Sequence, residues 1–187
     1  YSTGTWTLKA CTSFRKLPIF HGFAFHTQKI AFQPGTDTLA IAATGWFDDP
    51  DKWDGKLPGP PSGRVLFWDV NGPPPDLRKD DVAHSLLAYP PDGSVRSIAY
   101  SPDGKQLATG TLERSKEGPG DTVLVWDTGT HGLLAKPLGG PSEDAGVTYA
   151  LAYTADGHYL LAGFSEKNGP IDIIDAHTLR LVDVVHA

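Results

Sequence analysis

The sequence of 187 residues lacks methionine altogether and has a single cysteine, Cys11. One cysteine excludes an internal disulfide, and we interpret Cys11 as a small buried hydrophobe because free cysteines usually pack in that way. The chain starts at Tyr1 without an initiator methionine, which favours processing, trimming, or a longer parent polypeptide. The compartment is therefore left open, with the cytoplasm as the working expectation.

The sequence also lacks clusters of lysine and arginine, and its formal net charge is −6. Binding to nucleic acid depends mainly on cationic contacts to phosphates, so we expect no nucleic-acid partner. No run is long and apolar enough for a membrane span or a signal peptide, so membrane insertion is not expected. Sustained helical periodicity is absent as well, whereas the 21 glycines and 16 prolines suit an all-β chain rich in loops.

What the sequence does contain is an internal repeat. The dipeptide Trp-Asp closes two strand-like runs, Arg64–Asp69 and Thr122–Asp127. A block that precedes the second run, Ser97–Gly110, recurs as Ala150–Gly163 and, in a more divergent form, as Lys29–Ala42. Repeats of this kind decide the architecture before any single residue does, because each unit must bury its apolar faces against its neighbours.

Each repeat block contains a turn that can reverse the chain tightly. In Asp103-Gly104 and in Asp156-Gly157, the glycine supplies a positive φ and the aspartate tolerates the left-handed region. The flanking runs are short and rich in β-branched and aromatic residues. We therefore predict hairpins at both positions.

Together, a Ser-Pro-Asp-Gly hairpin and a later strand ending in Trp-Asp make the chain resemble the WD-repeat β-propeller family. The resemblance implies an all-β fold of blades with four antiparallel strands, as part of a larger propeller of the seven-bladed type. It divides residues 1–187, as a single partial propeller, into an outer half blade (1–25) and three blades (26–91, 92–140 and 141–187). The structural residues that it implies are Trp68, Asp69, Asp103, Gly104, Trp126, Asp127, Asp156 and Gly157.

The family also carries a buried polar network around its tryptophan. Trp68 and Trp126 are present, and either Thr109 or Thr111 could supply the hydroxyl. The histidine expected before the first strand of a blade is missing, and the third repeat has Ile174-Asp175 in place of Trp-Asp. The network is therefore expected to be incomplete.

Two insertions, Gly45–Gly63 and Leu112–Gly120, lengthen the connections between second and third strands. In this topology both emerge on one rim, and insertions gathered on one rim of a repeat scaffold usually mark its binding face. Exposed aromatic and cationic side chains are frequent anchors for partners. The partner-binding residues predicted on this rim are Trp46, Phe47, Trp53, Arg114 and Lys116. The alternative for the three aromatic residues, which the sequence slightly favours, is that they pin the first insertion to the propeller.

The first insertion also contains Asp49, Asp51 and Asp54 before Gly55, which resembles a Ca²⁺ loop. The third aspartate comes one residue late and no bidentate glutamate follows, so we favour a solvated acidic loop over a metal site.

These patterns favour a noncatalytic scaffold for protein–protein interaction or assembly, with no catalytic residues and no cofactor. Its partners include the chain or segment that completes the propeller. One alternative is a propeller enzyme, lactonase-like or quinoprotein-like, with a metal or cofactor on the axis. The first-strand starts offer Thr27, Ser94 and Thr148 rather than ligands for such a group. A second alternative is a purely structural subunit of a larger complex.

Overall fold

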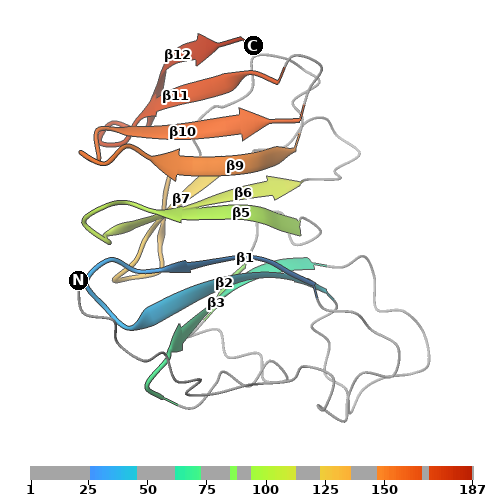
Figure 1. The fold of residues 1–187 in the computed structure, drawn as a ribbon, viewed down its shortest axis with the longest axis vertical. Helices are drawn as coiled ribbons and strands as arrows, with labels where there is room; N and C mark the ends of the chain where they lie inside the picture. The colour runs from blue at the N-terminus through green and yellow to red at the C-terminus, as the bar shows by residue number, and fades with distance from the viewer. Residues whose placement is uncertain are drawn as a thin grey trace, which may run out of the picture.

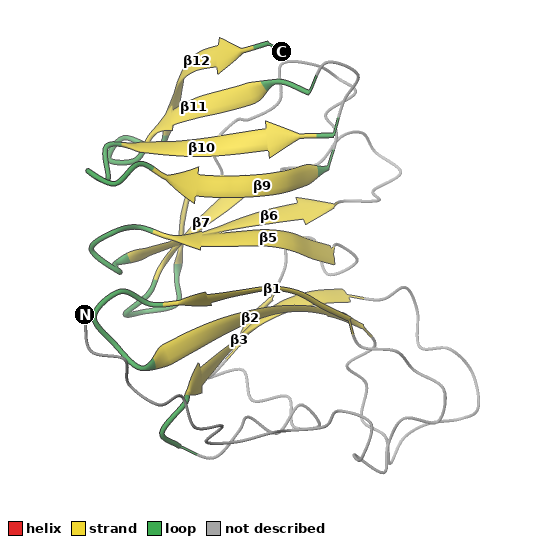
Figure 2. Cartoon of the chain, viewed as in Figure 1, coloured by secondary structure: helices red, strands yellow, loops and turns green. Residues whose placement is uncertain are grey.

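A computed structural model describes residues 26–45, 62–72, 85–87, 94–112, 123–135, 147–165 and 169–186. All regular structure in these ranges is β, as predicted, and it forms three four-stranded antiparallel sheets that follow one another along the chain (Figures 1 and 2). Accordingly, the described ranges contain no helix with the length and apolarity to cross a membrane.

Each sheet is a meander whose strands pair in sequence order. The first blade contains β1 (His26–Phe32), β2 (Thr38–Gly45), β3 (Ser62–Asp69) and β4 (Ser85–Leu87). The second contains β5 (Ser94–Tyr100), β6 (Gln106–Leu112), β7 (Val123–Asp127) and β8 (Leu133–Ala135). The third contains β9 (Thr148–Tyr153), β10 (Tyr159–Phe164), β11 (Ile171–Asp175) and β12 (Arg180–Val185). The first strands β1, β5 and β9 lie next to one another, so the blades stack in order.

The strand registers show that the repeats are structurally equivalent. Leu39 pairs with Trp68, Leu107 with Trp126, and Leu160 with Ile174. The two tryptophans therefore occupy the same blade position, as the repeat predicts, and an isoleucine takes that position in the third blade.

Two apolar clusters hold the blades together. We call the face toward the preceding blade the leading face and the opposite one the trailing face. In the first cluster, the trailing face of the first blade packs on the leading face of the second. The first blade contributes Ala40, Ala42, Val65 and Phe67, and the second contributes Val95, Ile98, Leu107, Leu124 and Trp126. In the next cluster, Ala108, Val123 and Val125 pack on Leu160, Ala162, Phe164 and Ile174. Small second-strand residues on trailing faces meet larger ones on leading faces, which permits dense packing.

One glycine marks how closely the second and third blades approach. A Cβ atom on Gly110 would overlap the hydroxyl of Ser97 and would lie 2.8 Å from Cγ2 of Thr148, on the first strand of the next blade. Any side chain at this position would push the blades apart, so the glycine permits their close approach.

The predicted hairpins are present. Gly104 and Gly157 have φ of 72° and 75°, and the amide of each donates a hydrogen bond to the carbonyl three residues earlier, on Ser101 and Thr154 respectively. The corresponding turn of the first blade uses Gly35, with φ of 75°. All three turns lie on the same rim of the stacked sheets (Figure 2).

Candidate functional site

The aspartate that ends the third strand of the second and third blades anchors the next turn. Oδ1 of Asp127 accepts hydrogen bonds from the amide and hydroxyl of Thr130, at 2.7 and 2.8 Å. Oδ1 of Asp175 accepts the same pair from Thr178, at 2.7 and 2.9 Å. These bonds from the threonines lower the pKa of both carboxyl groups. The turn explains why Asp175 is present although Ile174 replaces the tryptophan.

The tryptophans differ in their hydrogen bonds. The indole of Trp126 donates a hydrogen bond to Oγ1 of Thr109 at 3.0 Å. Of the two candidates Thr109 and Thr111, it is therefore Thr109 that supplies the hydroxyl. In the first blade, Ile41 stands at the position of Thr109, and Trp68 donates instead to the carbonyl of Gly72 at 3.3 Å. The network is therefore incomplete, as predicted: of these two tryptophans, only Trp126 in the second blade bonds to a threonine.

The hairpin aspartates serve their own turns. Oδ1 of Asp103 accepts from the Ser101 hydroxyl at 2.6 Å and from the Lys105 amide at 3.1 Å. Asp156 is held in the same way by Thr154 and by the amide of His158. In each case the hydroxyl bond is the main reason that the pKa of the carboxyl group is lowered. Both carboxylates are thus ionised at neutral pH.

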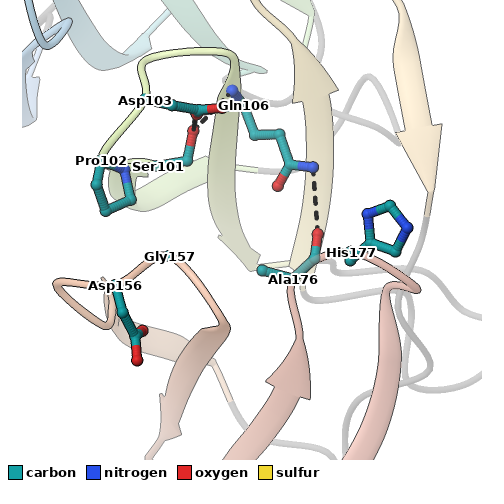
Figure 3. Close-up of a pocket in the computed structure, with 8 residues that line it drawn as sticks. All are labelled: Ser101, Pro102, Asp103, Gln106, Asp156, Gly157, Ala176 and His177. Atoms are coloured by element: carbon teal, nitrogen blue, oxygen red, sulfur yellow. Dashed lines mark hydrogen bonds between the residues drawn. The ribbon is translucent and has the colours of Figure 1, made fainter.

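A pocket of about 270 Å³ opens between these two hairpins, where the second blade meets the third (Figure 3). It is lined by Ser101, Pro102, Asp103, Gln106, Asp156, Gly157, Ala176 and His177. Its volume lies just under the roughly 300–1,000 Å³ of pockets that enclose whole small molecules. The pocket therefore suits a single side chain better than a cofactor.

Gln106 bridges the two blades beside this pocket. Its Nε2 donates to the carbonyl of Ala176 at 3.2 Å, and its Oε1 accepts from the Tyr153 hydroxyl at 3.1 Å. Burial raises the pKa of Tyr153 well above its ordinary value, so the phenol keeps its proton and acts as the donor. The amide of Gln106 is thereby held in one orientation.

The predicted rim residues lie outside the described residues, as do the calcium candidates: Trp46, Phe47, Trp53, Arg114, Lys116, Asp49, Asp51 and Asp54. The strand ends that flank the first insertion, Gly45 and Ser62, pair at the far end of the sheet from the Gln33 turn. Within the described part of the chain, no group of three or more His, Cys, Asp or Glu side chains could hold a metal ion.

Sequence reasoning interpreted the hairpins as structural and did not find the pocket between them. Gln106, Ala176 and His177 gave no motif, because none of them belongs to a recognisable constellation. A signal was nevertheless available. Aligning the repeats places Ser101 at the position of Gln33 and Ala176 at the position of Thr128. Smaller side chains at a junction between blades leave space there.

No family model and no curated protein matches this sequence. Among solved structures, the chain is similar to the β-propeller domain of the Trilobed protease from Pyrococcus furiosus, described as having an open velcro topology, with 14% identity and a TM-score of 0.51. It is also similar to the RRP9 WD40 repeats, with 18% identity and a TM-score of 0.55. Each match covers 87% of this chain but only 43% and 42% of the other, so the chain spans less than half of the propellers that it matches. The stacked meanders and these likenesses together identify the fold as a β-propeller.

Proposed function

We propose that this chain is the interacting part of a noncatalytic scaffold of the WD-repeat type, and that its first partner is the protein segment that extends the stack of blades. One observation carries the proposal. Apolar side chains on the two end faces are exposed, whereas the residues equivalent to them inside the stack are covered by a neighbouring blade.

The leading face of the first blade shows this on its first strand. Ile30 and Phe32 are 61% and 58% exposed. Their equivalents in the second blade, Ile98 and Tyr100, pack in the first apolar cluster. Leu39, on β2 of the same face, is buried, so the exposed part of this face lies along β1.

The trailing face of the third blade is open in the same way. Ile171 pairs with Gly163 as Val123 pairs with Gly110, so the two residues are equivalent. Val123 is fully buried against the third blade, whereas Ile171 is 41% exposed. Burial of apolar area contributes about 25 cal/mol per Å², so covering such a face is a substantial driving force for association.

The rim with the insertions is the second surface of the proposed scaffold. Trp46, Phe47, Trp53, Arg114 and Lys116 are its proposed anchors, because aromatic and arginine side chains dominate binding energies at protein interfaces. The turn carboxylates of the described ranges support a noncatalytic role, since Asp103, Asp127, Asp156 and Asp175 each accept hydrogen bonds that shape their own turns.

Affinity capture of the chain, followed by cross-linking and mass spectrometry, tests this function. We expect partner cross-links on the insertion rim, and weaker capture when Trp53→Ala is introduced than when Thr36→Ala is introduced on the opposite rim. Recovery of a reproducible partner that both variants retain equally would contradict a binding face on the insertions. Turnover of an ester or lactone substrate by the purified protein would contradict the noncatalytic role.

A further inference from the structure

The junction between the first and second blades contains a side chain that crosses from one blade to the other. Nε2 of Gln33 donates a hydrogen bond of 2.9 Å to the carbonyl oxygen of Gly104, in the hairpin of the second blade. The hydroxyl of Thr128 donates to the same oxygen at 2.8 Å. Two donors, one from each blade, therefore fill this junction and satisfy the turn carbonyl.

The corresponding junction between the second and third blades lacks both donors. The backbone bonds from Thr128 to Lys105 and from Ala176 to His158, at 3.0 and 2.9 Å, show that Thr128 and Ala176 are equivalent. Ser101 stands at the position of Gln33, and its hydroxyl is engaged with Asp103 in its own turn. Ser101 therefore does not cross the junction as Gln33 does, and Ala176 has no hydroxyl to donate as Thr128 does.

The pocket of Figure 3 lies at this second junction, where the equivalent donors are missing. Gly157, the equivalent of Gly104, lines it, and among the described residues no donor reaches its carbonyl oxygen. A Cβ atom on either glycine would lie 3.6 Å from Cδ of a proline in the preceding blade, Pro102 for Gly157 and Pro34 for Gly104, so both hairpins face a proline across the junction. The junctions differ in the side chains at the positions of Gln33 and Thr128, which are Ser101 and Ala176 at the second junction.

We propose that this pocket binds an arginine side chain of a partner protein, whose guanidinium takes the places of the Gln33 amide and the Thr128 hydroxyl. A guanidinium offers five N–H donors in a planar fork, which can serve a carbonyl and an adjacent carboxylate together. Asp103 and Asp156 line the pocket from its two hairpins and favour a cationic donor over a neutral amide.

The charged groups around the pocket are consistent with this choice. Lys105 is 4.0 Å from Oδ2 of Asp103, but its side chain is 81% exposed, so that ion pair is screened by solvent and gives way at little cost. His177 also lines the pocket. The inference deepens the proposed scaffold function, and it adds a site on the hairpin rim, separate from the insertions.

The test is a titration of the full chain with N-acetyl-arginine amide, followed by amide chemical shifts in NMR spectra. Phe32→Glu and Ile171→Lys on the two end faces, neither of which lines the pocket, keep the chain monomeric for this measurement. We expect saturable shifts at Gly157, Ala176 and His177, with a dissociation constant on the order of millimolar for so small a ligand. N-acetyl-citrulline amide has nearly the same shape without the charge, and we expect it to bind at least about tenfold more weakly. Equal shifts with citrulline, or no shift at these residues, would overturn the proposal.

The matched variants exchange the two junctions. Ser101→Gln with Ala176→Thr supplies the missing donors, and we expect it to abolish the arginine shifts. Gln33→Ser with Thr128→Ala opens the first junction, and we expect new shifts at Gly104. If the double substitution at the second junction does not fold, Asp156→Asn provides a milder variant that should weaken arginine binding but not citrulline binding. If Ser101→Gln with Ala176→Thr loses arginine binding but captures a partner as well as the original chain does, the pocket is not a partner site. That outcome would refute this site while leaving the scaffold function intact.

Discussion

The indole nitrogen of Trp126 donates to the hydroxyl of Thr109 across 3.0 Å, and both side chains are buried. Thr109 belongs to the second strand of its blade and Trp126 to the third, so the bond fixes the tryptophan ring within its own sheet. A buried donor without a partner costs about 1–3 kcal/mol. The bond is therefore a determinant of the leading face of the second blade.

Thr109→Val should destabilise the chain by about 1–3 kcal/mol, because valine has the shape of threonine but cannot accept the indole N–H. Urea unfolding followed by tryptophan fluorescence or circular dichroism measures the loss. The control is a double-mutant cycle with Trp126→Phe, in which the phenyl ring needs no acceptor. If Thr109→Val costs as much in the Trp126→Phe background as in the original chain, the bond is not the cause.

Gly104→Val should destabilise the chain by roughly 1–3 kcal/mol, because a β-branched residue is strained at positive φ. The structure adds a second reason, since a Cβ atom there would lie 3.0 Å from the carbonyl oxygen of Pro34 in the first blade. Gly129→Ala is the matched control: Gly129 lies in an exposed turn, where the added Cβ would meet Asp127 at an ordinary 3.5 Å. An unchanged melting temperature for Gly104→Val would refute the turn assignment.

The sequence could predict the blades because their signals are local. A turn glycine, an alternating strand and the Trp-Asp dipeptide each act within a few residues, and the described residues form four-stranded antiparallel blades, as predicted. The junctions between blades could not be predicted in the same way. The bond from Gln33 to the carbonyl of Gly104 joins residues 71 positions apart, whereas the hydroxyl of Ser101 turns back to Asp103, only 2 positions away. Repeat alignment shows such differences only once the strand register is known.

Acid should weaken the turns that follow the third strands. The pKa of Asp127 and of Asp175 is lowered in the folded chain, mainly by the bonds from Thr130 and Thr178. A group with a lowered folded pKa stabilises the fold above its unfolded pKa, and this contribution is lost as pH falls through the folded pKa. The melting temperature of the chain should therefore fall from about pH 4 downward.

The variant Asp127→Asn with Asp175→Asn should be less stable at neutral pH and should show a shallower decline in acid, since these two carboxyl groups no longer titrate. Melting temperatures between about pH 2 and pH 7 compare the two proteins. Thr130→Val retains the carboxylate but removes the hydroxyl donor to Asp127, which brings the folded pKa closer to the unfolded one, so its decline in acid should be smaller and should end at a higher pH. Parallel declines in all three proteins would show that other groups govern the acid response.

The last prediction concerns the end faces of the stack. Closed propellers have about 4–8 blades, and the described residues form three. In a closed ring each trailing face meets a leading face, as Ala108, Val123 and Val125 meet the third blade here. The exposed residues Phe32 and Ile171 lack such a cover among the described residues, and repeat proteins cap faces of this kind with polar residues when they end.

Expressed alone, the 187 residues should therefore self-associate or aggregate, because association covers Phe32 and Ile171. Phe32→Glu together with Ile171→Lys should shift sedimentation toward the monomer in analytical ultracentrifugation. Leu134→Lys is the control, since Leu134 is 49% exposed on the outermost strand β8 and belongs to neither end face. A chain that is monomeric, soluble and cooperatively folded without these substitutions would contradict the prediction, because it would show that the end faces tolerate water. Equal effects of Leu134→Lys would mean that general surface charge, rather than the open blade faces, controls association.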